Sequence, residues 1–209
     1  MTAIEQPLIK TIYDLFYLVR TRPKMYLGNN GKTLTALIAF VNGYNFACLH
    51  KGVELDEGTP PYSHFVHWIT YRLFGKPSSL PWEFMEYQLG QSVAFSTFFE
   101  MLDEFRSLQP CLLASIQPSS KHQLTGKVKV LIHQGNPEDS LHRYVPSTIA
   151  IFGYPNVSVC FISYEYSSHP PYKTMYNSLK EALDFIKRDI NIQISEWNFT
   201  EMGNDRIKT

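Results

Sequence analysis

A glycine-rich turn in front of a helix is the first place where this sequence could perform chemistry. Gly28 and Gly31 precede Lys32 and Thr33, and the residues after Thr33 have a helical pattern. Backbone N–H groups of such a turn, together with the helix N-terminus, can bind the phosphates of a nucleotide. The phosphate-binding loop needs four residues between its glycines, whereas two separate Gly28 from Gly31. The spacing therefore favours a turn and a helix cap.

Histidine and cysteine residues are the next candidates for a reactive or metal-binding site. His64 and His67 share one face of a predicted helix, but two imidazoles supply only half of a tetrahedral metal site. Cys48, Cys111 and Cys160 lie far apart in the sequence and show no paired ligand spacing. We predict no metal site, no cofactor and no catalytic residue. A cysteine that meets a histidine only in space stays an open alternative.

The composition is that of a folded protein without net charge. Of the 209 residues, 44% are hydrophobic and 18% charged, which favours burial over disorder. Lys and Arg total 19, and so do Asp and Glu. Nucleic-acid binding needs an excess of basic residues, so we predict no nucleic-acid partner. The odd number of cysteines, and the lack of a signal-like N-terminus or membrane-length apolar run, predict a cytoplasmic protein with no membrane partner.

The first half has the three- and four-residue spacing of apolar side chains that is typical of helices. One predicted helix starts at Leu8 and stops before Pro23, and a second runs from the N-cap Thr33 to Gly52. Two more cover residues 63–74 and 81–89. The next helix carries an aromatic stripe that we expect in the core: Phe95, Phe98, Phe99, Leu102 and Phe105.

From Pro110 the pattern changes to that of strands. We predict strands over 128–132, 148–154 and 157–166, of which the last two form a hairpin. A capping box formed by Ser178 and Glu181 begins a helix, the residues Ile190, Ile192 and Ile194 alternate as a final strand, and 201–209 form a polar tail.

Helices followed by strands indicate an α+β fold. We expect a helical region over residues 1–110, then a small, mostly antiparallel sheet with one helix over 111–209. Residues 117–126 are the expected linker, and a single continuous core is the alternative.

Residues 22–28 read Arg-Pro-Lys-Met-Tyr-Leu-Gly, and this motif carries two family resemblances. It resembles a segment of gyrase-type ATPases. In that family the next helix supplies a glutamate that activates water, but its position falls near Ala39, and no Asp-x-Gly-x-Gly segment follows.

The second resemblance covers more of the chain. The motif resembles the opening of bacterial immunity proteins that are encoded beside contact-dependent growth inhibition and other polymorphic toxins. The same likeness includes further segments of the chain: 37–40, 43–47, 65–68, 72–75, 82 and 98–105. The likeness spans roughly residues 8–106, with Lys24 in place of the usual Gly and Met101 in place of Leu.

This resemblance implies a protein that binds a cognate toxin and neutralises it by occluding the toxin's active site. Such a role needs a complementary surface with aromatic anchors and a polar rim. Candidate contacts lie in an acidic loop, on the outer face of the aromatic helix and in an aromatic-rich run: Glu54, Asp56, Glu57, Glu100, Asp103, Glu104, Tyr164, Glu165, Tyr166, Tyr172 and Tyr176.

The motif itself we interpret as structural. Pro23 ends the first helix, Gly28 permits a turn, and Met25 with Tyr26 fills the gap between the first two helices. Two alternatives to the immunity hypothesis stay open. One is an adaptor or scaffold for another partner, and the other is an unrecognised enzyme or degenerate ATPase.

Overall fold

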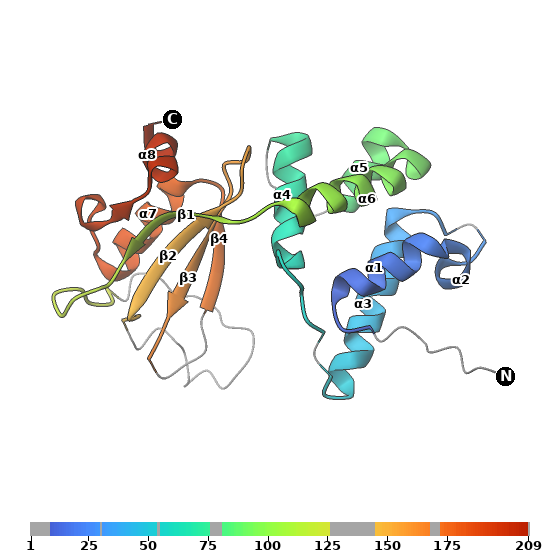
Figure 1. Ribbon diagram of the computed structural model, residues 1–209, viewed down its shortest axis with the longest axis horizontal. Helices are drawn as coiled ribbons and strands as arrows, with labels where there is room; N and C mark the ends of the chain where they lie inside the picture. Colours follow the sequence, from blue (N-terminus) through green and yellow to red (C-terminus); the bar gives the residue numbers. More distant parts are fainter. Residues whose placement is uncertain are drawn as a thin grey trace. The chain divides into compact units, whose positions relative to one another are not determined.

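The chain divides into two compact units, Met1–Leu108 and Gln109–Thr209. The computed structural model describes residues 9–29, 31–53, 55–75, 81–125, 145–167 and 172–208 (Figure 1). At residues 172, 173 and 208 it describes the main chain and not the side chain. The fold is α+β, because helices make up unit 1 and a sheet with helices makes up unit 2.

Unit 1 consists of helices, which lie close to the predicted positions. They are α1 (Ile12–Thr21), α2 (Pro23–Leu27), α3 (Leu34–His50), α4 (Tyr62–Phe74), α5 (Pro81–Leu89) and α6 (Gln91–Ser107). The short helix α2 was not predicted from the sequence.

Local capping residues explain where two of these helices, α1 and α3, begin. Thr11 Oγ1 accepts a hydrogen bond from the Asp14 backbone N–H at 3.2 Å, and Asp14 Oδ2 accepts one from Thr11 N–H at 2.8 Å. This capping box starts α1 at Ile12, later than the predicted Leu8. The predicted N-cap Thr33 is confirmed, because its hydroxyl oxygen accepts the Ala36 N–H at 3.1 Å.

The core of unit 1 is built around the aromatic stripe of α6. The ring of Phe98 lies 5.3 Å from Phe16, 5.4 Å from Phe65 and 5.3 Å from Trp82, measured between ring centroids. All five predicted stripe residues are buried. The prediction of a core seam is therefore confirmed, and edge-to-face and tilted ring contacts connect α1, α4 and α5 to α6.

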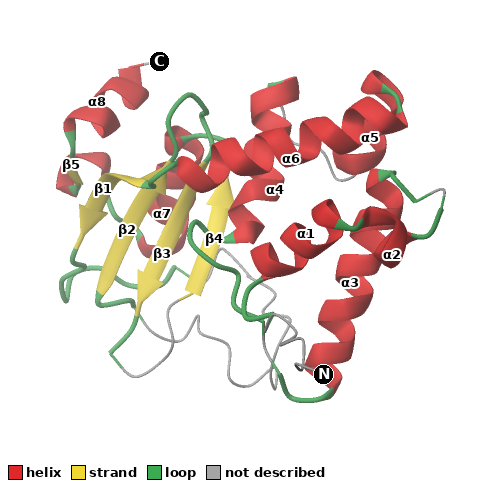
Figure 2. Ribbon diagram, turned by 45° about the vertical axis from the view of Figure 1, so that its right-hand side comes forward, coloured by secondary structure: helices red, strands yellow, loops and turns green. Residues whose placement is uncertain are grey.

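Unit 2 contains an antiparallel sheet with the strand order β4-β3-β2-β1-β5. The strands are β1 (Cys111–Ile116), β2 (Thr148–Gly153), β3 (Cys160–Glu165), β4 (Tyr172–Tyr176) and β5 (Asn198–Phe199). Helix α7 (Leu179–Ile190) lies against one face of the sheet (Figures 1 and 2), and α8 (Glu201–Lys208) contacts β1 and β5.

The predicted hairpin and the predicted capping box are both confirmed. Strands β2 and β3 pair from Thr148↔Glu165 to Gly153↔Cys160. Ser178 Oγ accepts the Glu181 N–H at 3.2 Å, and Glu181 Oε2 accepts the Asn177 N–H at 3.0 Å. Helix α7 then buries its apolar face, including Leu183, in the core of unit 2.

Three predictions for unit 2 are wrong. The final strand at residues 190–194 does not form, because Asn191 adopts a left-handed conformation that ends α7 and Ile194 begins a short 3₁₀ helix, η3 (Ile194–Glu196). The expected polar tail is helix α8, whose start is capped by Thr200 Oγ1 accepting the Gly203 N–H at 3.2 Å. The expected linker belongs to unit 2, since Thr125 N–H donates to Asp189 O at 2.7 Å. The predicted strand at 128–132 lies outside the described residues.

Candidate functional site

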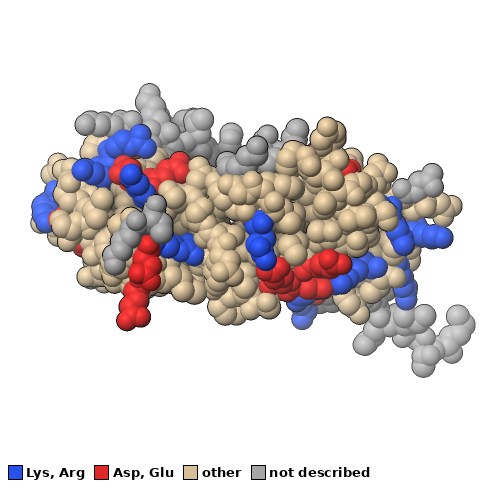
Figure 3. Space-filling model, turned by 90° about the horizontal axis from the view of Figure 1, so that it is seen from above, with Lys and Arg blue, Asp and Glu red and all other residues tan. Residues whose placement is uncertain are grey.

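Two of the three predicted acidic contacts on α6 connect that helix to its neighbours. Asp103 Oδ2 lies 2.6 Å from Arg20 Nη1 of α1, and Glu104 Oε1 lies 3.5 Å from Arg72 Nε of α4. All four side chains are partly exposed, so these ion pairs contribute little to stability. Glu100 is exposed. Figure 3 shows charged side chains of both signs lying next to one another on the visible face.

Two residues of the predicted acidic loop, Asp56 and Glu57, make hydrogen bonds within unit 1. Asp56 Oδ1 accepts the Gly58 N–H at 2.8 Å, and the main chain of Asp56 accepts the Ile12 N–H at 2.9 Å. Glu57 Oε2 accepts the hydroxyl of Ser63 at 2.5 Å and so holds the first turn of α4. Glu54 lies outside the described residues. The loop thus joins the starts of α1 and α4.

The predicted aromatic run does not form one exposed surface. Tyr164 is 4% exposed and belongs to the core of unit 2, which corrects the expectation of an exposed ring there. Tyr166 and Tyr176 are half-buried against the same core, and the ring of Tyr176 lies 5.0 Å from that of Phe185. Glu165 is exposed, and the side chain of Tyr172 lies outside the described residues. Alternation along β3 and β4 explains this division, because only every second side chain shares a face.

The motif at residues 22–28 is only partly structural. Tyr26 packs on Phe40 of α3 with 5.6 Å between ring centroids, as expected of a residue between the first helices. The same expectation is wrong for Met25, whose side chain is 68% exposed. Gly28 has a φ of 77°, which other residues rarely adopt, so it ends α2. Core packing therefore does not explain Met25.

The N-terminus of α3, where a phosphate would bind in a nucleotide site, holds a carboxylate of the protein itself. Glu86 of α5 accepts the Leu34 N–H at 2.5 Å and the Thr35 hydroxyl at 2.7 Å. A negative charge at this position is stabilised by the free N–H groups and the helix dipole. A nucleotide phosphate would have to displace Glu86.

Helix α3 presents an unusual apolar surface. Its 17 residues include no Asp, Glu, Lys or Arg, and its buried side chains, Leu34, Leu37 and Val41, all lie in its first ten residues. Further along, Phe46 is 64% and Leu49 is 54% exposed. A helix that is apolar on all sides is normally covered, so exposed apolar residues of this kind mark a surface for another molecule.

The other strongly exposed apolar side chains also belong to unit 1. Tyr17, Val53, Tyr87 and Val93 are each more than half exposed. Among the described residues of unit 2, no large hydrophobic side chain is exposed to that extent. The apolar surface available to a partner is thus concentrated in unit 1.

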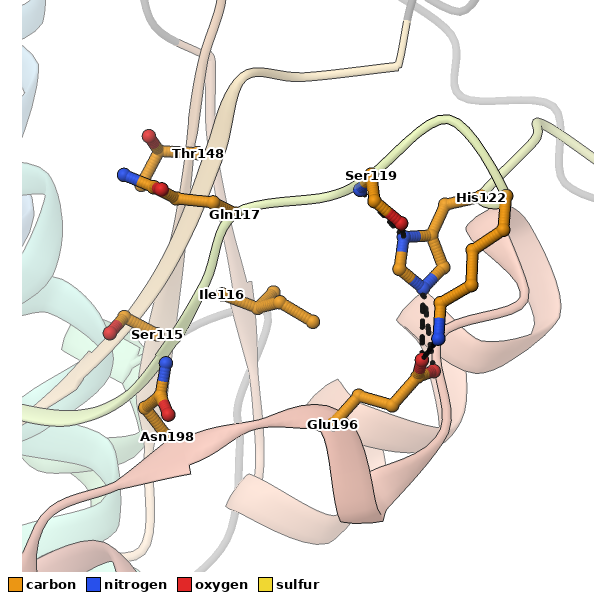
Figure 4. A pocket seen from close by; sticks show the side chains of 9 residues that line it. Ser115, Ile116, Gln117, Ser119, His122, Thr148, Glu196 and Asn198 are labelled. Atoms are coloured by element: carbon orange, nitrogen blue, oxygen red, sulfur yellow. Dashed lines mark hydrogen bonds and ion pairs between the residues drawn. The ribbon is translucent and has the colours of Figure 1, made fainter.

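Unit 2 contains a polar pocket of about 540 Å³ at the end of β1 (Figure 4). Ser119, His122 and Glu196 lie together on one side of the pocket. The hydroxyl and amide side chains of Ser115, Gln117, Thr148 and Asn198 lie on the other side. The lining residues are Ser115, Ile116, Gln117, Ser119, Lys121, His122, Thr148, Glu196 and Asn198.

Ser119, His122 and Glu196 are residue types found in catalytic triads, but their hydrogen bonds differ from those of a triad. Ser119 N–H donates to His122 Nδ1 at 2.9 Å and fills the lone pair that would have to accept a proton from Ser119 Oγ, 3.3 Å away. Nε2 therefore carries the ring proton and donates to Glu196 Oε1 at 3.3 Å. The buried imidazole connects the 119–122 turn to η3, which is a structural role.

Glu196 is held in the charged form by several donors. Its side chain bonds with Lys121, its Oε2 accepts the Gln193 N–H at 2.8 Å, and His122 donates to it. These contacts, Lys121 first, lower the pKa of Glu196 to about 2 from its ordinary 4.5. Lys121 and Glu196 therefore form an ion pair in the wall of the pocket, where each charge is balanced by the other.

The three cysteines and His67 are the remaining candidates for chemistry. Cys160 is buried, and burial raises the pKa of its thiol to about 12, so its reactive thiolate is suppressed. Cys48 and Cys111 are half-buried. Burial lowers the pKa of His67. Within the described residues, no three His, Cys, Asp or Glu side chains are placed to hold a metal ion.

No protein-family model, curated protein or solved structure matches this chain. Among the described helices, none combines the length and apolar character needed to cross a membrane.

Sequence reasoning missed Glu86, Lys121, His122 and Glu196 as structural partners. Glu86 lies 52 residues from Leu34, and Glu196 lies 74 residues from His122, so no local pattern connects them. One signal was visible in the sequence. The uncharged stretch from Leu34 to His50 is too apolar for a helix with one solvent face.

Proposed function

We propose that this protein binds a protein toxin and neutralises it by covering the toxin's active site, with unit 1 as the main binding part. The observation that carries the proposal is the exposed apolar surface of α3, formed by Phe46 and Leu49. It lies in the part of the chain that resembles bacterial immunity proteins, and apolar or aromatic residues with little surrounding charge are typical of interface centres.

The first experiment identifies toxin-like reading frames next to this gene in the native host and co-expresses each encoded toxin domain with this protein. We expect cells to survive the toxin only when this protein is present. Equal killing with and without the protein would contradict the proposal. A different protein that co-purifies from the native host would favour the adaptor alternative.

Two variants test whether the toxin binds to unit 1. Phe46→Asp and Leu49→Asp each put a charge into the α3 surface, and we expect the toxin's dissociation constant to rise at least tenfold, because a buried unpaired charge is costly. The matched control is Ile194→Asp, an exposed apolar position in unit 2. Titration calorimetry with an inactive toxin variant measures all three. Equal losses in all three would refute the placement in unit 1.

A further inference from the structure

The connection between α1 and α3 carries three basic residues and no acidic residue of its own. Residues 22–33 include Arg22, Lys24 and Lys32 and contain no Asp or Glu. All three basic side chains are exposed, and Met25 lies between them in the sequence with 68% of its side chain exposed. We name these four residues the α2 corner. Figure 3 shows basic side chains gathered at the edge of unit 1 that carries α2.

Two arginines of unit 1 outside the α2 corner form ion pairs with acidic side chains of neighbouring helices. Arg20 pairs with Asp103, and Arg72 pairs with Glu104. Within the part of the chain that the structure describes, Arg22, Lys24 and Lys32 take part in no ion pair. Their charge is therefore available to a molecule that binds from outside.

The backbone of the α2 corner is held in place by its surroundings. Pro23 occupies the first turn of α2, and the Gly28 N–H donates to Lys24 O at 3.1 Å. A Cβ at Gly31 would overlap the carbonyl of Leu27, so the turn is closed tightly against α2. The Tyr26 ring is fixed on Phe40. With Tyr26 directed toward α3, Met25 is left in the solvent on a short, fixed helix.

This combination fits an acidic protein surface better than a nucleic acid. Nucleic-acid binding gains much of its affinity from the neutralisation of many phosphates, and the α2 corner offers three cations. Exposed methionine is a polarisable, adaptable side chain that fills irregular apolar pockets on protein partners. Complementary charge around such an anchor speeds association and selects the partner.

We propose that the α2 corner binds an acidic patch on the toxin, with Met25 inserted into an apolar pocket that acidic side chains surround. This inference rests on the proposed function and names the charge of the partner's surface. It also gives the motif at residues 22–28 a binding role in addition to its turn.

The test measures association and dissociation rates with an inactive variant of the toxin that the co-expression experiment identifies. For the double variant Arg22→Glu/Lys24→Glu we expect the association rate to fall about tenfold or more at low salt, with the difference shrinking as salt rises. For Met25→Ala we expect dissociation to become about tenfold faster. The matched control, Lys180→Glu/Lys187→Glu, makes the same charge change at exposed positions of α7 and should leave both rates unchanged. Thermal unfolding of each variant confirms that it is folded.

The outcomes separate this inference from the proposed function. Binding of the wild-type protein with rates unaltered by the α2-corner variants would overturn the inference and leave the proposed function standing. Lack of binding by the wild-type protein would overturn both. If the double variant lost affinity for a labelled DNA or RNA duplex and kept its affinity for the toxin, the corner would be a nucleic-acid surface instead. Rescue of the double variant by an acidic-to-lysine change in the toxin would support the proposed contact.

Discussion

At the scale of single residues, Glu86 shows how a distant side chain supports the start of a helix that Thr33 caps locally. Its carboxylate accepts the first N–H of α3 and the hydroxyl of Thr35. We expect Glu86→Gln to lower the free energy of unfolding by about 1 to 2 kcal/mol, because a charge-assisted bond at a helix N-terminus becomes a neutral amide contact.

Urea unfolding followed by circular dichroism measures this change. Glu100→Gln makes the same chemical change at an exposed position of α6 and should stay within about 0.5 kcal/mol of wild type. If both variants lost the same stability, Glu86 would have no special role at α3.

Glu196 gives the second prediction at this scale, which concerns pH. Its pKa is about 2 in the folded protein and 4.5 ordinarily, so it contributes stability above pH 4.5 that is lost as the pH falls toward 2. We expect the wild-type protein to lose stability more steeply than Glu196→Gln between pH 5 and pH 2.5. Urea midpoints across that range measure the difference, and parallel curves would contradict the prediction.

At the scale of elements, the packing of α8 depends on the absence of a side chain at Gly203. A Cβ there would overlap the carbonyl oxygen of Leu113 in β1. Arg206 of the same helix donates to Tyr154 O, which fixes the helix from its other end. We expect Gly203→Ala to destabilise the protein by about 1 to 3 kcal/mol, because α8 must move away from the sheet.

Gly43 in α3 provides the opposite case. A Cβ at Gly43 would meet nothing within 4 Å, so Gly43→Ala should stabilise by about 0.5 to 1 kcal/mol through helix propensity. Thermal unfolding of the two variants should therefore shift in opposite directions. Stabilisation by Gly203→Ala would mean that helix propensity, rather than close packing, controls position 203.

Signals that lie within one turn of the chain were sufficient to predict most elements. Pro23 marked the end of α1, Thr33 and Ser178 marked helix starts, and the β-branched and aromatic residues in 148–154 marked a strand. Strand β1 was missed because its sequence, CLLASI, has only one β-branched residue and no polar–apolar alternation. The final strand was misplaced because the alternation of Ile190, Ile192 and Ile194 was given more weight than Asn191, a residue type that can adopt the left-handed conformation at the end of a helix.

The candidate surfaces were harder to predict than the elements, since exposure depends on which face of an element packs. Met25 and Tyr26 are adjacent, and only the observed helix α2 shows that Tyr26 packs and Met25 does not. Tyr164 was expected at the surface for the same reason, although its strand turns it into the core.

At the scale of the whole molecule, each unit has its own buried core. Unit 1 is centred on Phe98, and unit 2 on the sheet residues that α7 covers. We expect residues 1–108 and 109–209 to fold when produced separately, because a compact unit of this size can bury enough apolar surface. Circular dichroism and dispersed amide NMR spectra measure this, and a fragment without cooperative unfolding would show that its core needs the other unit.

The buried cysteine of β3 makes the opening of unit 2 measurable in the intact chain. Cys160 is shielded from solvent and keeps its proton until about pH 12, so an alkylating reagent at neutral pH can reach it only when the sheet opens. Mass spectrometry would measure the rate at which Cys160 is alkylated. This rate would report how often the sheet of unit 2 opens in the intact chain.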